Sequence, residues 1–342
     1  MIMLQRISIS QKERQRGVAL LVVLLLVATL ALVAISITEQ TTFMAARSIN
    51  ERARAETLWR AFGAETLAAA AAEAAYEASG GKVSLDDPWM TEPLIVPMDD
   101  GSARIFFADN TICLNINSLG EPAPGGGAGI VGPTIQEFSL LARNLGLSEF
   151  EGEALAEAIA DWVDGDTRRR PRGAEDEYYT DLPSPYRTGN QPVASVSEIR
   201  AVRGVSRDIY AALKPFLCAH PDSKQSLMNV NMLTERHAPL LAASFEMMAK
   251  EGKSVTVLQA AEIIADRPPG GWPDIEGFLA QPKVKILLDG GSGADRFDVK
   301  SNYIQARAEI VYDTAVLEMT ADIGLADDGK AVILARRFGA EE

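Results

Sequence analysis

The chain has 342 residues, and its 47 Asp and Glu against 33 Lys and Arg give it a net charge of −14. That length excludes a single small module and leaves room for two or three domains. Such an acidic body argues against a nucleic-acid-binding protein, because phosphates would be repelled, and it suits solubility or cation binding.

The N-terminal part is dominated by an uncharged apolar block of 20 residues at 18–37, VALLVVLLLVATLALVAISI. As a helix rising about 1.5 Å per residue, it would span about 30 Å, the thickness of a bilayer's hydrocarbon core. The helical pattern continues to residue 78, no proline occurs before Pro88, and Gly80 and Gly81 provide an end signal. We therefore predict one helix of about 60 residues whose first third lies in a membrane.

The leader of residues 1–17 carries four basic side chains and one acidic one, a net charge of +3. Basic flanks stay in the cytoplasm, so the rest of the chain is expected to cross the membrane. The apolar block is longer than the about 7–15 residues of a secretory signal peptide, and no A-x-A pattern closes it. Two alternatives stay open: an uncut N-terminal anchor, or cleavage between Gly17 and Val18, which would keep the helix.

Strand patterns lie at both ends of the part that follows the helix. They cover residues 94–96, 102–109 and 111–119, and then 303–312, 316–323 and 331–338. Between them lie helical patterns, which indicates one antiparallel sheet interrupted by an insertion. A sheet packed on the polar half of the long helix would bury the apolar faces of both. The predicted fold class is α+β.

The insertion begins with a Gly- and Pro-rich linker at 121–132 and is predicted to be all α-helical. Helices are predicted at 134–145, 148–163, 239–250, 258–265 and 273–280, with two short ones around Gly204 within 195–217. The segment LNINSL at 114–119 is echoed by MNVNML at 228–233, which suggests two helical subdomains. The pair at 195–217 is similar to a DNA-gripping helix-hairpin-helix, but without a basic surface a structural use is favoured.

Six acidic side chains lie within residues 161–177, in the sequences DWVDGD and GAEDEYY. Oxygen donors on an irregular loop are what Ca²⁺ needs, about six to eight of them at about 2.3–2.6 Å. An EF-hand is excluded, because a template that starts at Asp164 places Arg169 where that loop requires glycine. From the residues alone, a calcium site and a solvated loop neutralised by the basic side chains of 168–172 both stay open.

The chain has two cysteines, Cys113 and Cys218, which would lie in oxidising surroundings in a bacterial envelope. Either a disulfide, closing a loop of about 105 residues, or two separately buried thiols fits the sequence. His220 and His237 lack zinc-ligand spacing and are expected at the surface. The chain carries no nucleophile elbow, P-loop or dinucleotide-binding pattern, so we predict no enzymatic activity.

The leader, the glycine border and the apolar helix together resemble the class III signal of type IV pilins and pseudopilins. The resemblance implies that a prepilin peptidase cuts between Gly17 and Val18 and that the new N-terminus is methylated. The fifth mature residue of that family is usually Glu, whereas here it is Val22. One branch characteristically lacks this Glu, the K-type minor pseudopilins of type II secretion systems. Residues 161–200 resemble the same branch through DWVDGD, GAEDEYY, SPYR and SVSEIR.

The K-type resemblance implies a pilin-like fold, in which the long helix packs on the sheet and the sheet carries a large all-α insertion with SAM-like or helix-hairpin-helix-like subdomains. The expected ranges are 1–17 for the leader, 18–37 for the transmembrane helix, 38–119 and 297–342 for the pseudopilin α/β domain, 120–227 for the first helical subdomain and 228–296 for the second. The resemblance also implies calcium in the acidic segment. Its ligands would be Asp164, Asp166, Glu175 and Asp176, with Glu177 and Asp181 as further candidates.

The implied function is that of a minor pseudopilin at the tip of the type II secretion pseudopilus, which initiates assembly and supports export of folded proteins across the outer membrane. The protein would cross the bacterial inner membrane once and place its C-terminal domain in the periplasm. Its implied partners are other minor pseudopilins, the major pseudopilin, the prepilin peptidase and the inner-membrane assembly platform. Two other classes stay open: a calcium-dependent periplasmic binding or adhesion module with an uncut anchor, and a DNA-handling envelope protein.

Overall fold

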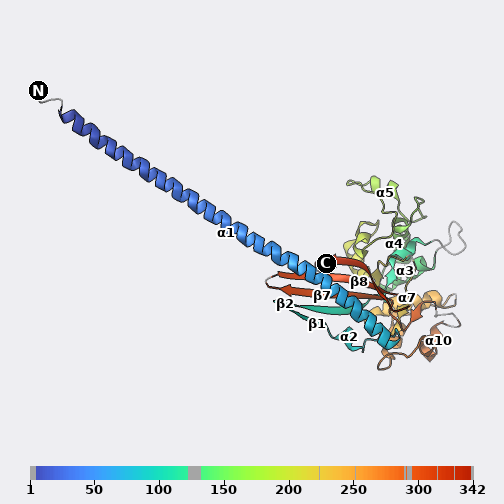
Figure 1. The fold of residues 1–342 in the computed structure, drawn as a ribbon. Helices are drawn as coiled ribbons and strands as arrows, with labels where there is room; N and C mark the ends of the chain where they lie inside the picture. The colour runs from blue at the N-terminus through green and yellow to red at the C-terminus, as the bar shows by residue number, and fades with distance from the viewer. Residues whose placement is uncertain are drawn as a thin grey trace.

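The structure is a computed structural model that describes residues 5–121, 132–222, 224–250, 252–288, 290, 295–313, 315–326 and 328–339, with side chains from residue 18 onward. One long helix leads into a head formed by a sheet and two groups of helices (Figure 1). The linker predicted at 121–132 lies almost entirely outside the described residues, as do residues 1–4 of the leader.

Helix α1 (Gln5–Ser79) runs for 75 residues without a break. It is longer than predicted because the leader continues the helix toward the N-terminus. The predicted glycine end signal is present: Gly80 and Gly81 have φ of +64° and +87°, and the Gly81 amide donates to the Tyr76 carbonyl at 2.7 Å. A left-handed pair of glycines satisfies the last carbonyls of the helix and turns the chain away.

Five antiparallel strands form one sheet in the order β1-β2-β7-β8-β9. The strands are β1 (Leu94–Met98), β2 (Gly101–Asp109), β7 (Tyr303–Tyr312), β8 (Ala315–Leu325) and β9 (Ala331–Phe338). β2 pairs directly with β7, from Gly101 opposite Tyr312 to Asp109 opposite Ile304. The whole insertion therefore leaves the sheet after Asp109 and returns just before Tyr303, which confirms the interrupted sheet and the α+β class.

The C-terminal third of α1 packs on one face of this sheet through small side chains. The buried residues of the helix are spaced three or four apart, as one face of a helix requires: Ala61, Ala64, Ala68, Ala72 and Tyr76. They meet alternate residues of the strands, among them Ile105, Ile304, Ile310 and Ile323. Alanine allows the helix backbone to approach the sheet closely, and the Arg336 guanidinium on β9 adds an ion pair to the buried Glu65 of α1.

The strand predicted at 111–119 is wrong. Only β3 (Leu114–Asn115) is extended, and it pairs in parallel with β4 (Leu217–Cys218) instead of joining the large sheet. A 3₁₀ turn, η1 (Ile116–Gly120), follows at once, because the Asn115 side chain accepts the amide hydrogen of Asn117. Asparagine competes with strand pairing through such local bonds, and its alternation with apolar residues imitated a strand pattern.

The echoed segment at 228–233 has the same local structure. β5 (Met228–Asn229) pairs in parallel with β6 (Phe297–Asp298), and η4 (Val230–Met232) begins where the Asn229 side chain accepts the Asn231 amide hydrogen. The second asparagine of each segment, Asn117 or Asn231, is also buried and exchanges hydrogen bonds with a distant backbone. Two short parallel pairs thus enclose two groups of helices, residues 114–218 and 228–298.

The remaining elements follow the predicted helical pattern with small shifts. The first group holds α3 (Pro133–Asn144), α4 (Glu149–Val163), α5 (Asp176–Thr180), η2 (Val196–Ala201), α6 (Arg207–Leu213) and η3 (Lys214–Phe216). The second holds η5 (Glu235–His237), α7 (Ala238–Met248), α8 (Val257–Ala265), α9 (Ile275–Leu279) and α10 (Pro282–Leu288), while α2 (Pro88–Thr91) lies before β1. The first member of the predicted hairpin is a 3₁₀ turn, and α2, α5 and α10 were not predicted.

Candidate metal centre

The acidic segment begins at the end of α4 in the first helical group. Ser148 caps the start of α4 in the predicted capping box with Glu151, and the helix ends at Val163, where Asp164 turns extended. The loop then folds back on α4 so closely that a side chain at Gly173 would collide with Asp161, since its Cβ would lie 2.0 Å from Asp161 Oδ2. Glycine at this position therefore holds the second half of the segment against the first.

Three of the four predicted ligands converge. One carboxylate oxygen each of Asp164, Asp166 and Glu175 lies within 4.8 Å of the other two. Asp166 is exposed, Asp164 is half-buried and Glu175 is buried. Oxygen donors of this hard, anionic kind are those that Ca²⁺ prefers.

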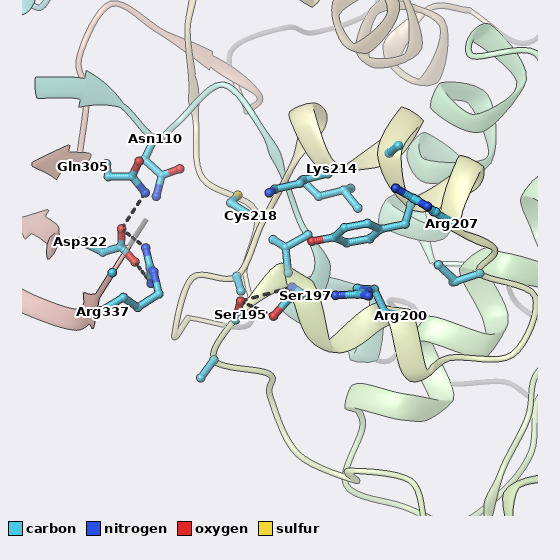
Figure 2. Close-up of a pocket in the computed structure, with 18 of the residues that line it drawn as sticks. Asn110, Ser195, Ser197, Arg200, Arg207, Lys214, Cys218, Gln305, Asp322 and Arg337 are labelled. Atoms are coloured by element: carbon cyan, nitrogen blue, oxygen red, sulfur yellow. Dashed lines mark hydrogen bonds and ion pairs between the residues drawn. The ribbon is translucent and has the colours of Figure 1, made fainter. Parts of the chain in front are cut away.

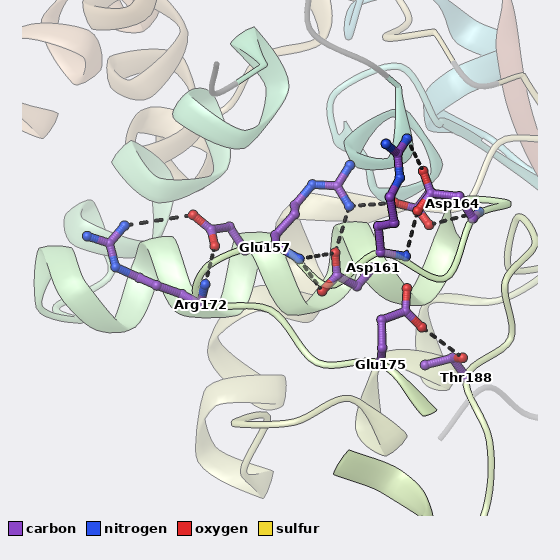
Figure 3. Close-up of polar contacts among 9 residues, drawn as sticks. Glu157, Asp161, Asp164, Arg172, Glu175 and Thr188 are labelled. Carbon is purple, nitrogen blue, oxygen red and sulfur yellow. Dashed lines mark hydrogen bonds and ion pairs between the residues drawn. The ribbon is translucent and has the colours of Figure 1, made fainter. Parts of the chain in front are cut away.

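The Glu175 carboxylate is the feature that points most directly to a cation. Its Oε1 is buried without a hydrogen-bond partner among the described residues, while its Oε2 accepts from the Thr188 hydroxyl at 3.3 Å. Burial, and then the charges of Asp161 and Asp164, raise the pKa of Glu175 to about 7. Figure 3 shows this carboxylate directed toward those of Asp161 and Asp164. A buried anionic oxygen without a partner is costly, and a divalent cation would compensate it.

Asp161 belongs to the same cluster, although the sequence did not single it out as a ligand. It lies in the last turn of α4 with no exposed surface, and burial raises its pKa to about 6 against the opposing hydrogen bonds of Arg170. The Arg170 guanidinium joins it to Asp164, at 2.8 Å and 2.5 Å respectively. The three-residue spacing of Asp161 and Asp164 at a helix end could have indicated the pair, whereas nothing in the sequence marked Thr188.

The basic side chains that the solvated-loop alternative requires do contact the acids. Besides Arg170, Arg168 lies 3.4 Å from Asp166, but both side chains of that pair are exposed and such pairs contribute little. Arg172 binds Glu153 and Glu157 on α4, outside the cluster. Arg170 therefore neutralises part of the cluster and leaves the Glu175 oxygen uncompensated, so the donor set fits a divalent cation.

Asp176 is the predicted ligand that the structure keeps apart. Its carboxylate accepts from the Thr188 amide at 2.9 Å and from the Thr188 hydroxyl at 2.8 Å, and it lies 3.4 Å from the Arg187 guanidinium. These hydrogen bonds lower the pKa of Asp176, the hydroxyl most. The further candidates Glu177 and Asp181 are exposed and do not join the cluster.

The cysteines and histidines do not form a second metal site. Cys113 and Cys218 are bonded to each other, with their Cα atoms 5.7 Å apart, so neither offers a thiolate to the nearby His220. The expectation that both histidines are exposed is wrong: His220 and His237 are 3% and 5% exposed. Burial lowers the pKa of each to about 4, and His220 stacks on Tyr303 with ring centroids 3.8 Å apart.

The candidate membrane span lies in α1. From Val18 onward this helix contains a window of mean hydropathy 3.3, and none of that window is buried inside the protein. An apolar surface of this length is stable in lipid and not in water. Gly17 and Val18, the predicted cleavage position, lie within α1 at the start of this surface.

Comparison with known proteins decides the family. Two family models described as type II secretion system (T2SS), protein K, match residues 112–222 and 228–299. The type II secretion system protein K of Pectobacterium carotovorum subsp. carotovorum is 36% identical over 266 residues, which cover 78% of this chain and 79% of that protein. That of Aeromonas hydrophila is 34% identical over 340 residues, covering 96% and 99%. The chain belongs to the protein K family of type II secretion systems.

A solved structure agrees with this family. A chain in the crystal structure of the GspK-GspI-GspJ complex from the type 2 secretion system of enterotoxigenic Escherichia coli superposes with a TM-score of 0.73 at 27% identity. The match covers 86% of the K-family chain described here and 100% of that chain. Protein K is thus a minor pseudopilin, a structural component of the secretion system, and α1 provides its candidate membrane anchor. The ligand set and the cleavage position stay predictions.

Proposed function

We propose that this protein K occupies the tip of the type II secretion pseudopilus, initiates its assembly and supports export of folded proteins across the outer membrane. Val22, which stands where most pilins carry Glu, carries the proposal. The Glu of an incoming subunit can neutralise the N-terminal amine of the subunit above it, and a charge left unpaired in lipid costs several kcal/mol. A subunit with Val22 offers no such carboxylate, and loses nothing if no subunit stands above it.

The shape of the head supports the same position. Both helical groups lie at the end of the molecule remote from the N-terminus of α1, beside and beyond the sheet (Figure 1). A subunit stacked above protein K would meet this bulk. The insertion therefore favours a terminal place over a repeated one along the shaft.

The exposed part of α1 provides a surface for other subunits. Between the apolar span and the sheet, the helix exposes large apolar side chains, among them Phe43, Met44, Ile49 and Trp59, which are 61–72% exposed. Apolar side chains of this size that are exposed to water are suited to packing with other helices. The relative of known structure forms a complex with two other proteins, GspI and GspJ. By extension we assign other minor pseudopilins as partners here, together with the major pseudopilin, the prepilin peptidase and the assembly platform of the inner membrane.

The position is tested by labelling and by one substitution. Antibody labelling of pseudopili should place the protein at one end, and the full chain should copurify with the other minor pseudopilins. Val22→Glu should leave secretion largely intact, because no subunit above depends on this position and an unpaired carboxyl group in lipid takes up a proton and becomes neutral. Regular labelling along the shaft, or no complex with the minor subunits, contradicts the proposal.

The leader is expected to be removed after Gly17. Substitution of Gly17 by tryptophan should block processing, because the peptidase requires a small residue at this border. Mass spectrometry of the membrane-bound chain should give a wild-type protein that begins at Val18 and a Gly17→Trp protein that keeps the leader. Gly63→Ala, a change in the same helix where an added Cβ meets no atom within 4 Å, should be processed normally. A wild-type chain that begins at Met1 would instead favour the uncut anchor of a binding module.

The acidic cluster has a structural role in this proposal. We assign Asp164, Asp166 and Glu175 as Ca²⁺ ligands, with Asp161 and Arg170 beside them. A bound cation would join the end of α4 to the start of α5 and so fix the loop between the two helices. Ca²⁺ would supply charge compensation and no chemistry.

Chelation of calcium is therefore expected to lower the thermal stability of the full chain in detergent. Binding to the folded state alone contributes about 2.7 kcal/mol at a free calcium concentration of 100 Kd. Asp164→Ala combined with Glu175→Ala should abolish the difference in Tm between calcium and chelator, whereas Glu177→Ala, at an exposed position, should retain it. A wild-type Tm that does not change with calcium would show a solvated loop.

A further inference from the structure

A groove of about 1320 Å³ lies between the first helical group and the end of the sheet (Figure 2). One wall is the hairpin of η2 and α6 with the turn that follows, and it contributes Arg200, Arg207, Tyr210 and Lys214. Strands β7, β8 and β9 contribute the opposite side with Gln305, Asp322 and Arg337. The proposed role at the tip of the pseudopilus involves none of these residues.

The groove is basic on an acidic protein. Four of its charged residues are cationic and one is a carboxylate, which gives the lining a net charge of +3, against −14 for the whole chain. The carboxylate, Asp322, is already bound by Arg337 at 2.7 Å and by the Gln305 amide at 3.2 Å. Within the described residues, the one carboxylate that lines the groove is therefore engaged by the sheet itself and is not paired with Arg200 or Arg207.

Arg200 and Arg207 supply the uncompensated charge. Both are exposed, and within the described part of the chain neither makes an ion pair. The Arg200 guanidinium lies 5.7 Å from the centre of the Tyr210 ring, a contact that orients the cation and leaves its N–H groups for an acceptor. Guanidinium groups are suited to carboxylates, which they can bind through two parallel hydrogen bonds.

The wall that carries these arginines is anchored to the rest of the first helical group. Cys218, which lines the groove, is fixed by its bond to Cys113. The hairpin is held from the other side, where the Arg203 amide donates to the Tyr179 hydroxyl at 3.1 Å and the Tyr186 hydroxyl donates to the Ala201 carbonyl at 2.8 Å. A preformed site loses less entropy on binding an extended segment than a mobile one would.

The groove lies next to the part of α1 on which other subunits are expected. Phe338, which lines the groove, contacts Phe62 of α1 with ring centroids 6.0 Å apart, and Phe62 contacts Trp59 at 5.8 Å. Trp59 is 72% exposed, so an aromatic row links the groove to the free part of α1. A protein that packs on α1 at this level can reach the groove across the edge of β9.

We propose that this groove binds an extended acidic segment of a neighbouring pseudopilin, whose Asp or Glu carboxylates pair with Arg200 and Arg207. The inference rests on the proposed function, because it takes the occupant from the same assembly. Nucleic acid is disfavoured, since a long polyanion would be repelled by the acidic surface around a groove with few cations.

Site-specific crosslinking tests the occupant. A photoreactive phenylalanine analogue replaces Ala211, an exposed residue of the groove wall, in full-length protein in cells with the complete secretion system. We expect crosslinking to another pseudopilin, within a segment that mass spectrometry shows to be rich in Asp and Glu. Crosslinking to an exported protein, to nucleic acid or to nothing would overturn the inference.

Charge reversal tests the chemistry. Arg200→Glu combined with Arg207→Glu should reduce the crosslink at least about fivefold, because repulsion replaces two ion pairs. The matched control Lys250→Glu with Lys285→Glu makes the same charge change at exposed positions of the second helical group and should leave the crosslink unchanged. An equal crosslink in both double variants would overturn the inference. If the minor subunits copurify but this crosslink is absent, the inference alone fails; if they do not copurify, the proposed function fails.

Discussion

Replacement of both Cys113 and Cys218 by alanine is expected to lower the free energy of unfolding by about 4–5 kcal/mol. The bond closes a loop with a sequence separation of 105 residues, and opening it returns that closure entropy to the unfolded chain. Both cysteines lie at the base of the first helical group, where the chain enters through β3 and leaves through β4. The disulfide joins these two ends covalently, beside the two-residue parallel pair and the hydrogen bonds that Asn115 and Asn117 make with the segment after β4.

Urea unfolding of the full chain in detergent measures the effect, followed by the fluorescence of Trp162 in a background where the other three tryptophans are replaced by phenylalanine. Reductant should destabilise the wild type by nearly the same amount and should leave the double alanine variant unchanged. Cavities left by two buried sulfur atoms would add to the loss in the variant but not in the reduced wild type. A difference below about 1 kcal/mol in both experiments would contradict the loop-closure explanation.

The long-range architecture could be predicted because it depends on patterns that survive without tertiary contacts. The absence of proline and the glycine pair after Ser79 set the end of α1, and alternation in 102–109 and 303–312 identified two strands that pair across the insertion. Hydrophobic periodicity was sufficient for α3, α4, α7 and α8, whereas it did not predict the short helices α5 and α10. The helix was predicted to begin too late, whereas α1 begins at Gln5, because the leader contains no proline to prevent a helix.

Local polar structure could not be predicted in the same way. Asn115 and Asn117 made 111–119 resemble a strand, yet their side chains are buried and hold the turn through hydrogen bonds with residues 76–107 positions away. The burial of His220 could not be predicted for the same reason, because this side chain stacks on Tyr303 of the distant strand β7. Contacts that join remote segments leave no periodic trace in the sequence.

The metal centre lies between these cases. Asp164, Asp166 and Glu175 were predicted because the acidic segment resembles that of the K-type branch, and the structure brings them together. Asp176 follows Glu175 directly, but it begins α5 and turns toward Thr188 instead. Adjacent residues at a helix start point in different directions, so a cluster in sequence overestimates the cluster in space.

Substitution of Arg296 by methionine is the second change with a large expected effect, a loss of about 3–5 kcal/mol in the free energy of unfolding. Arg296 and Glu137 are 3% and 1% exposed and form an ion pair with Nε 3.0 Å from Oε1. The Ser244 hydroxyl donates to the same carboxylate, and the arginine also donates to the Ser226 carbonyl at 2.7 Å. Without the guanidinium, the Glu137 carboxylate would remain a buried anion that has lost its counter-charge and keeps the hydrogen bond from the Ser244 hydroxyl.

This pair also joins the two helical groups, because Glu137 belongs to α3 of the first while Ser244 and Arg296 belong to the second. Arg296→Met should therefore divide unfolding into two transitions, followed separately in single-tryptophan backgrounds that retain Trp162 in the first group or Trp272 in the second. Arg296→Met combined with Glu137→Leu should regain most of the lost stability, since a buried ion pair can be replaced by apolar side chains at little cost. A single transition at wild-type stability in Arg296→Met would show that apolar packing between α3 and α7 holds the two groups together without the pair.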